Sequence, residues 1–354
     1  MIESGAESLV LTNVWAAILA FAVFMYVVMD GFDLGIGILF PIFGVGRERD
    51  TAMNSIAPVW DGNETWLVLG GGGLMAAFPL AYGIVMSALY APLIAMLLAL
   101  VFRGVAFEFR WRDPRHRPLW DFMFTAGSFT AALAQGVTLG ALLQDIEVKG
   151  RAYAGGWWDW LTPFSLLTGF SVVAAYSLLG ACWLNWKTDG ETQKHARRLM
   201  RIWAPITLAC ILAVSACTPF LGDVYFQRWF SMPRVLFTAQ VPLIIAILTW
   251  RFVRSLRRNY DLAPFVITLA VFALSFTGLG ISMYPYLIPN SVTLEMAAAP
   301  ASSQAFMLVG AAVLVPLILA YTAWSYWVFR GKVAHEGLSL ICRLACQRVP
   351  KKRH

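Results

Sequence analysis

Charged residues are scarce in this sequence. Asp, Glu, Lys and Arg make up 13% of its 354 residues, whereas hydrophobic residues make up 59%. A typical soluble domain has about 25% charged and roughly 45–50% apolar residues. The composition therefore excludes an ordinary soluble domain and predicts an all-α polytopic membrane protein, because helices satisfy their own backbone hydrogen bonds in lipid.

Histidine and cysteine are also rare, and their positions exclude several kinds of site. The histidines lie outside the long apolar runs, at His116, His195, His335 and His354. No predicted span therefore offers an imidazole to a b-type haem, to zinc or to a Ser–His protease. The five cysteines show no CxxC spacing and there is no ATP-binding motif. We expect this chain alone to bind no metal or haem.

Nine apolar runs approach the roughly 20 residues that a helix needs to cross the hydrocarbon core. We place them at about 12–41, 56–78, 80–107, 118–144, 160–186, 198–221, 232–254, 262–284 and 303–329. These runs form one predicted transmembrane domain, 1–329. A basic tail, 330–354, follows it.

The Lys and Arg distribution predicts the orientation. The loops on one side and the tail carry 23 of the 27 Lys and Arg, counting Arg103 as a loop residue. The positive-inside rule makes that side cytoplasmic, with the N-terminus outside and the C-terminus inside. Spans 1–4 and spans 5–8 cross the membrane in the same alternating order, with basic loops at matching places. This pattern suggests two four-helix bundles plus one peripheral helix. The net charge of +7 is dispersed between spans, so we expect no nucleic acid partner.

Two pairs of acids interrupt the first two spans. Asp30 and Asp33 lie late in the first span, and Asp61 and Glu64 lie early in the second. A spacing of i,i+3 places both members of each pair on one helix face. An ionisable group at membrane depth is costly and usually functional. We therefore expect all four acids to gather in the cytoplasmic half of a helix hairpin.

The acids indicate a proton path from the cytoplasm through Asp61, with help from Glu64, Asn63 and Asp30. The alternative role is structural: the same groups hold the hairpin together through Asn63, Thr65 and the Trp indoles. The structural role is favoured for Asp33 and the functional role for Asp61. Within the same spans, the glycines are expected to allow close helix packing. They are Gly31, Gly35, Gly37, Gly70, Gly71, Gly72 and Gly73.

Five segments of the sequence carry a family resemblance: 30–37, 54–67, 102–110, 283–289 and 315–327. The most specific part is the run Trp60-Asp61-Gly62-Asn63-Glu64. With these segments the sequence resembles subunit II of the cytochrome bd-type quinol oxidases.

The resemblance implies partner subunits, cofactors and a reaction, which the residues alone do not. The family pairs this chain with subunit I, which carries the quinol site, two b-type haems and one d-type haem, and in some members with a small single-span subunit. The complex oxidises quinol and reduces O2 to water in the bacterial cytoplasmic membrane, taking protons from the cytoplasm. Asp61 matches a residue of a proton path, and Trp66 one near an O2 channel. We expect Trp60, Asp33 and Glu108 to support or line these routes.

The resemblance also implies a structural quinone or lipid on this subunit, as in some members. The short 222–231 connection points to the branch called cyanide-insensitive. Two alternatives remain open: a secondary transporter or proton channel, which buried acids would also suit, and a scaffold in which Asp61 has no role.

Overall fold

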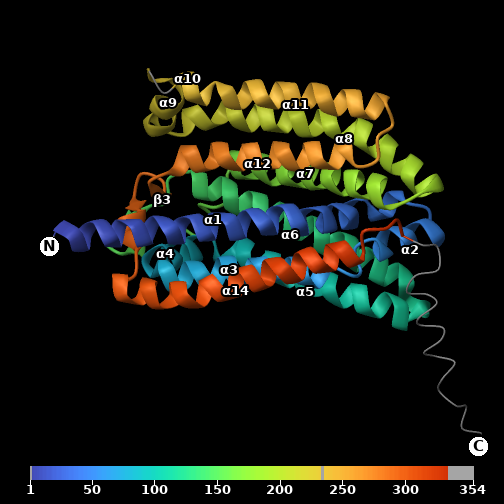
Figure 1. The fold of residues 1–354 in the computed structure, drawn as a ribbon, viewed down its shortest axis with the longest axis horizontal. Helices are drawn as coiled ribbons and strands as arrows, with labels where there is room; N and C mark the ends of the chain where they lie inside the picture. The colour runs from blue at the N-terminus through green and yellow to red at the C-terminus, as the bar shows by residue number, and fades with distance from the viewer. Residues whose placement is uncertain (1, 233–234, 334–354) are drawn as a thin grey trace, which may run out of the picture.

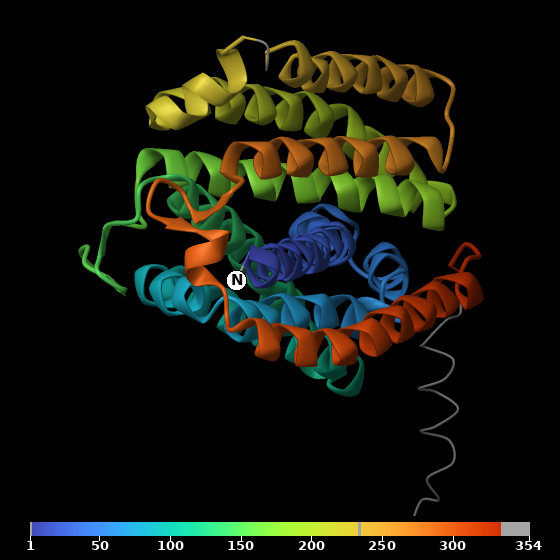
Figure 2. The same cartoon turned by 60° about the vertical axis from the view of Figure 1, so that its left-hand side comes forward.

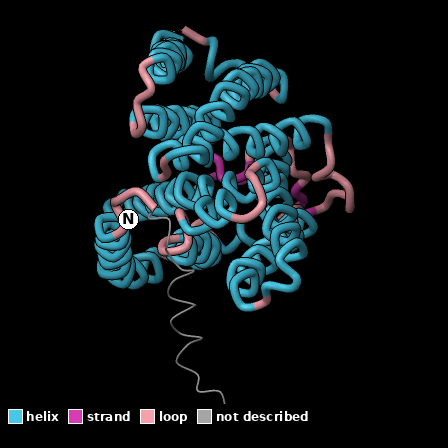
Figure 3. Tube along the Cα trace, turned by 90° about the vertical axis from the view of Figure 1, so that its right-hand side faces the viewer, coloured by secondary structure: helices cyan, strands magenta, loops and turns pink. Residues whose placement is uncertain are grey.

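The computed structural model describes residues 2–232 and 235–333, and this part of the chain is almost entirely helical (Figure 3). The α-helices are α1 (Ile2–Leu39), α2 (Arg47–Asn54), α3 (Trp60–Ala77), α4 (Pro79–Ala88), α5 (Tyr90–Arg112), α6 (Arg117–Leu143), α7 (Pro163–Lys187), α8 (Gly190–Cys217), α9 (Asp223–Phe230), α10 (Val235–Thr238), α11 (Gln240–Arg257), α12 (Ala263–Met283), α13 (Leu294–Ala297) and α14 (Ala301–Val328). Short 3-10 helices are η1 (Phe40–Ile42), η2 (Pro114–His116) and η3 (Thr218–Leu221), and the strands are β1 (Val148–Lys149), β2 (Ala152–Tyr153), β3 (Tyr286–Ile288) and β4 (Val292–Thr293).

Helix α1 runs through the middle of the bundle and packs against α3, α6 and α7 (Figure 1). A Cβ atom on Gly35 would lie 1.8 Å from the backbone oxygen of Tyr176, so only glycine permits this approach of α1 to α7. Gly31 and Gly37 are similarly close to side chains of α7 and α6. These three glycines therefore lie where α1 packs closely on α6 and α7.

The glycine run on α3 behaves differently. A Cβ atom on Gly73 would lie 2.6 Å from Leu19, and one on Gly70 would make an ordinary contact with Val23. Gly71 and Gly72 have no atom within 4 Å of such a Cβ. Within the described chain these two glycines therefore lie on an open side of α3.

Seven helices are long and apolar enough to cross a membrane in the part of the chain that the structure describes. The count is eight if α3 and α4, which are bent by 120° at Phe78, form one broken span. The predicted run 232–254 corresponds to α11, whose last turns carry Arg251, Arg254 and Arg257. The chain is therefore a polytopic helical membrane protein, and its nine membrane spans remain a prediction.

Two predicted helix boundaries are wrong. Residues 80–107 do not form one helix, because α4 ends at Ala88 and α5 starts at Tyr90. The second span does not start at residue 56, because Asn54 ends α2 and α3 begins only at Trp60, after a turn that contains Pro58. Proline disfavours helix at the residue before it, which accounts for the later start.

The remaining helices form layers on either side of α1. Helix α12 packs on α7 and α11, and α8 and α11 form the outermost layer (Figures 1 and 2). Helix α14 lies on the opposite side, against α1 and α3. None of the residues in its most apolar window is buried, so this helix keeps a long apolar face uncovered in the described chain.

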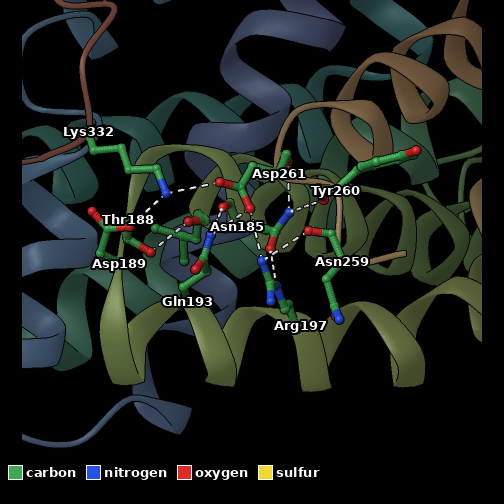
Figure 4. A network of polar contacts seen from close by, with 10 residues as sticks. Asn185, Thr188, Asp189, Gln193, Arg197, Asn259, Tyr260, Asp261 and Lys332 are labelled. Atoms are coloured by element: carbon green, nitrogen blue, oxygen red, sulfur yellow. Dashed lines mark hydrogen bonds and ion pairs between the residues drawn. The ribbon is translucent and has the colours of Figure 1, made fainter. Parts of the chain in front are cut away.

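A polar network ties the end of α14 to two loops at one end of the bundle (Figure 4). Lys332 Nζ lies 2.6 Å from Asp189 and 3.0 Å from Asp261, and Arg197 lies 2.9 Å from Asp261. Partial burial alone would raise the pKa of Asp261, but the hydrogen bond from Lys332 and the charge of Arg197 outweigh it and lower that pKa. Beyond these first residues, the predicted basic tail (334–354) lies outside the described residues.

Candidate functional site: a buried ion cluster

Arg103 on α5 is the centre of a cluster of charges inside the helix bundle. Its side chain is fully buried. Its Nη1 atom lies 2.8 Å from Asp30 Oδ1 and 2.6 Å from Glu64 Oε1, and Nη2 lies 3.8 Å from Asp33 Oδ2. Assigning Arg103 to a cytoplasmic loop was wrong, because it lies nine residues before the end of α5, about 13 Å along the helix.

Three helices position the cluster. Asp30 and Asp33 lie one turn apart on α1 and both face α5, as their i,i+3 spacing predicts. Glu64 comes from α3, which packs along α1. A planar guanidinium with five donors can serve several carboxylates at once, which a lysine ammonium on the same stem would do less well.

Asn63 connects the cluster to α14. Its Nδ2 donates to Asp33 Oδ2 over 2.7 Å, and its Oδ1 accepts a hydrogen bond of 2.9 Å from the hydroxyl of Tyr326. A small cavity of about 20 Å³ lies beside this pair and is also lined by Tyr321 and Ser325. A space of that size with several polar walls can hold about one water molecule.

Asp61 does not join the cluster. It is exposed, and among the described residues its carboxylate makes no hydrogen bond or ion pair. A helix turns by about 100° per residue, so Asp61 lies about 160° around α3 from the buried Asn63, while Glu64 lies between the two directions. The prediction that all four acids gather is therefore wrong for Asp61 and confirmed for Asp30, Asp33 and Glu64.

The other predicted supporting residues lie in different surroundings. Trp60 stacks on Phe107 with ring centroids 5.1 Å apart. Trp66 is fully buried and meets Phe21 edge-on at 5.7 Å. Glu108 is exposed and forms an ion pair of 3.4 Å with Arg112, rather than with the cluster.

Sequence reasoning missed Arg103, Tyr326 and a polar chain deeper in the bundle. In that chain Gln135 donates to the Tyr26 hydroxyl over 2.8 Å, and the Tyr176 hydroxyl donates to Gln135 over 2.8 Å. An available signal was the position of Arg103 itself. It follows an apolar run of ten residues, 93–102, and precedes the next arginine by a further seven residues.

A second ion network lies nearer the end of the bundle. Arg110 binds Asp121 at 2.5 Å and Asp50 at 2.7 Å, and Arg49 binds Asp121 at 2.8 Å. These contacts join α2, α5 and α6. Asp50 and Arg49 are partly exposed, so this network meets the aqueous edge and fixes the loop before α3.

The two histidines among the described residues are each paired with an acid. His116 lies 2.7 Å from Asp113, and its hydrogen bond lowers the pKa of that carboxyl; His195 lies 3.2 Å from Glu48. His116 lies in η2 and His195 in the first two turns of α8, so each lies near one end of a candidate span rather than in its middle. Within residues 2–232 and 235–333, no group of His, Cys, Asp and Glu has the geometry of a metal site.

Fold and site together define a polytopic helical membrane protein with a buried cluster of three carboxylates around one arginine. The chain belongs to the family described as cytochrome bd terminal oxidase subunit II, whose model matches residues 11–329. The resemblance seen in the sequence is thereby confirmed, and the family makes the chain a subunit of a haem-containing membrane oxidoreductase with a partner subunit I.

Individual relatives agree with this assignment. The cytochrome bd-I ubiquinol oxidase subunit 2 of Escherichia coli K12 is 31% identical, over 93% of this chain and 97% of that protein. The cytochrome bd ubiquinol oxidase subunit 2 of Bacillus subtilis is 29% identical, over 92% of this chain and 98% of that protein. A chain in the structure of bd oxidase from Geobacillus thermodenitrificans shares the fold, with a TM-score of 0.73 at 19% identity, covering 91% of this chain and all of that one.

Proposed function

We propose that this chain delivers protons within an oxidase that oxidises quinol and reduces O2 to water. The observation that carries the proposal is the cluster of Asp30, Asp33 and Glu64 around Arg103. The partner subunit I holds the quinol site, two b-type haems and one d-type haem. The names of the relatives, which are ubiquinol oxidase subunits, support quinol as the electron donor.

Glu64 is the link between the surface and the interior. Its side chain is 26% exposed, yet it lies 2.6 Å from the buried guanidinium of Arg103. Asp61 is exposed one turn earlier on the same helix. A proton that reaches Asp61 can therefore pass to Glu64 and then to Asp30, which contacts the same Nη1 atom of Arg103 as Glu64 does.

The charge balance of the cluster suits proton uptake. Three carboxylates face one guanidinium, so full ionisation would leave a formal charge of −2 in a low-dielectric interior. Carboxylates that share such a site exchange protons as a unit rather than one by one. Asn63 donates a hydrogen bond to Asp33 on the α14 side, so Asp33 has the more structural role. Glu64 and Asp30 are then the residues that pass the proton.

Asp61 also indicates where subunit I binds. A carboxylate exposed to lipid near membrane depth costs at least about 2.5–3.5 kcal/mol, so it is expected to be covered by protein or water. Gly71 and Gly72 extend the same open side of α3 and allow another helix to approach closely. We infer that this side of α3 contacts subunit I and brings Asp61 next to a hydrated path.

The finer topology belongs to the same proposal. We propose nine spans in a single transmembrane domain, arranged as two four-helix bundles with α14 as the peripheral helix. The N-terminus lies outside and the basic tail in the cytoplasm of a bacterial inner membrane. A small third subunit, a structural quinone or lipid, and an O2 route near Trp66 complete the expected complex.

The deciding experiment is quinol-driven O2 uptake by the purified complex, measured for wild type, Asp61→Asn and Glu64→Gln. Both variants should keep the haem spectrum and slow O2 uptake, most strongly above neutral pH, where protons are scarce. Unaltered rates at every pH would contradict the proton path. A colourless chain that moves solute would favour the transporter instead.

A further inference from the structure

Helix α11 carries an exposed apolar stripe that ends in a group of arginines. Leu243, Ile247 and Trp250 are all exposed, Trp250 to 60%. At about 100° per residue these three positions and Arg254 fall within an arc of roughly 60° on the helix. Phe252, which lies on the opposite side of α11, is buried. The stripe therefore faces away from the bundle.

The arginines lie on the same face as the stripe. Arg251, Arg254 and Arg257 are exposed, and their positions fall within about 120° of arc centred near Arg254. The Arg254 guanidinium lies over the Trp250 ring, 5.4 Å from its centroid. Stacking of this kind holds the charge at the junction between the apolar stripe and the helix end.

No acidic side chain neutralises these three arginines in the described residues. Asp261 is the acid nearest in sequence, and it is bound by Arg197 at 2.9 Å and by Lys332 at 3.0 Å. The basic residues of the neighbouring network are thus paired with acids, whereas those of the α11 face are not. This contrast leaves the charges of the α11 arginines available to an external anion.

The position of α11 leaves the site accessible. It lies beside α8 in the outermost layer, and its arginine end is at the same end of the bundle as α2 (Figures 1 and 2). Helix α8 adds the exposed Arg198 and Arg201 near that end. An anion at the membrane surface would therefore meet positive charge from two helices.

We propose that this face binds an anionic phospholipid. Its phosphate lies between Arg251 and Arg254, and its acyl chains lie along Leu243 and Ile247 below the Trp250 ring. The guanidinium groups match phosphate oxygens in geometry and charge, and the aliphatic stripe matches the chains. A soluble anion would use the arginines but not the apolar stripe.

The test compares lipid binding by the intact complex in bilayer nanodiscs that contain zwitterionic phosphatidylethanolamine and a minor fraction of cardiolipin. Native mass spectrometry counts the lipids that stay bound. The test variant is Arg251→Gln/Arg254→Gln. The control is Arg112→Gln/Arg115→Gln, which removes the same charge from two other exposed arginines.

Wild type and control should retain cardiolipin in preference to phosphatidylethanolamine, and this preference should fall by roughly thirtyfold in the test variant, as expected for the loss of two charge contacts. Excess inorganic phosphate should leave retention unchanged, since it lacks chains. Equal retention in all three proteins would overturn the proposal. So would an equal loss in both variants, or displacement by phosphate.

Discussion

Arg103 on α5 and Glu64 on α3 form an ion pair of 2.6 Å in which the arginine is fully buried and the glutamate is 26% exposed. The pair therefore spans the boundary between the bundle interior and its surface. Groups on such a boundary can exchange protons with one side while their charge is stabilised from the other.

Replacing Arg103 with Gln should destabilise the chain severely. The variant leaves Asp30, Asp33 and Glu64 without their cation, and breaking a buried pair costs about 3–5 kcal/mol. Thermal unfolding of the purified complex measures the loss. The matched control, Arg112→Gln, breaks an exposed pair and should cost no more than about 1 kcal/mol. Equal melting temperatures for the two variants would show that the buried ion cluster does not depend on Arg103 for its stability.

Glu64→Gln and Asp61→Asn should differ from Asp33→Asn. The first two remove proton carriers on the proposed path, so O2 uptake should fall by at least about tenfold with the fold intact. Asp33→Asn mainly weakens the contact with Asn63, so it should lower stability more than rate. Rates with melting curves for each variant separate the effects; a fast Glu64→Gln enzyme would count against the path.

Tyr326→Phe should have a small and specific effect. The hydroxyl donates to Asn63 over 2.9 Å, and loss of one such hydrogen bond costs about 1 kcal/mol. The remaining ring still packs, so the change reports on the link between α14 and the cluster. Tyr326→Phe should lower the melting temperature by a few degrees in the otherwise wild-type complex and by much less in an Asn63→Ala background. An undiminished drop there would mean that the two residues are not coupled.

Two glycines give opposite predictions for the same substitution. Gly35→Ala places a methyl group 1.8 Å from the Tyr176 backbone oxygen, so α1 and α7 must separate, at a cost of about 1–3 kcal/mol or more. Gly72→Ala meets nothing within 4 Å and gains up to about 1 kcal/mol of helix propensity in the isolated chain. If subunit I covers α3, Gly72→Ala should instead weaken assembly. Chromatography of the two-subunit complex reads out that loss.

The network around Lys332 should be insensitive to pH over a wide range. The hydrogen bond to Asp189 raises the pKa of Lys332, and its charge helps to lower the pKa of Asp261. A lowered carboxyl pKa adds stability above about pH 4 that is lost on acidification, and a raised lysine pKa adds stability below about pH 10 that is lost in base. The network should therefore persist from about pH 5 to about pH 9.

Hydrogen exchange at the Val333 amide, which bonds to the Lys187 carbonyl at 2.8 Å, measures this. Once intrinsic exchange is corrected for pH, protection should be constant across that range and lost in Lys332→Gln, while Arg115→Gln leaves it unchanged. A midpoint near neutrality would instead implicate a histidine.

Much of the fold follows from the sequence because length and hydropathy define membrane helices directly. The i,i+3 spacing also placed Asp30 and Asp33 on one face correctly. The spacing could not give the rotation of α3 about its own axis. Whether Asp61 or Asn63 faces the interior depends on where α3 begins, and the turn at Pro58 places that start several residues later than predicted. Arg103 was misplaced for a related reason, since counting charges assigns an arginine to a loop without asking which acids lie opposite it.

Helix α14 is fastened at two distant points. Near its start, Gln304 accepts from Trp15 at 3.0 Å and donates to Ala299, and near its end Tyr326 reaches Asn63. A single residue inserted between them would rotate every later side chain by about 100° and advance it by about 1.5 Å. The hydrogen bonds of Gln304 and of Tyr326 could not then both form. The number of residues between them is therefore fixed, even though the middle of α14 makes few contacts with the rest of the chain.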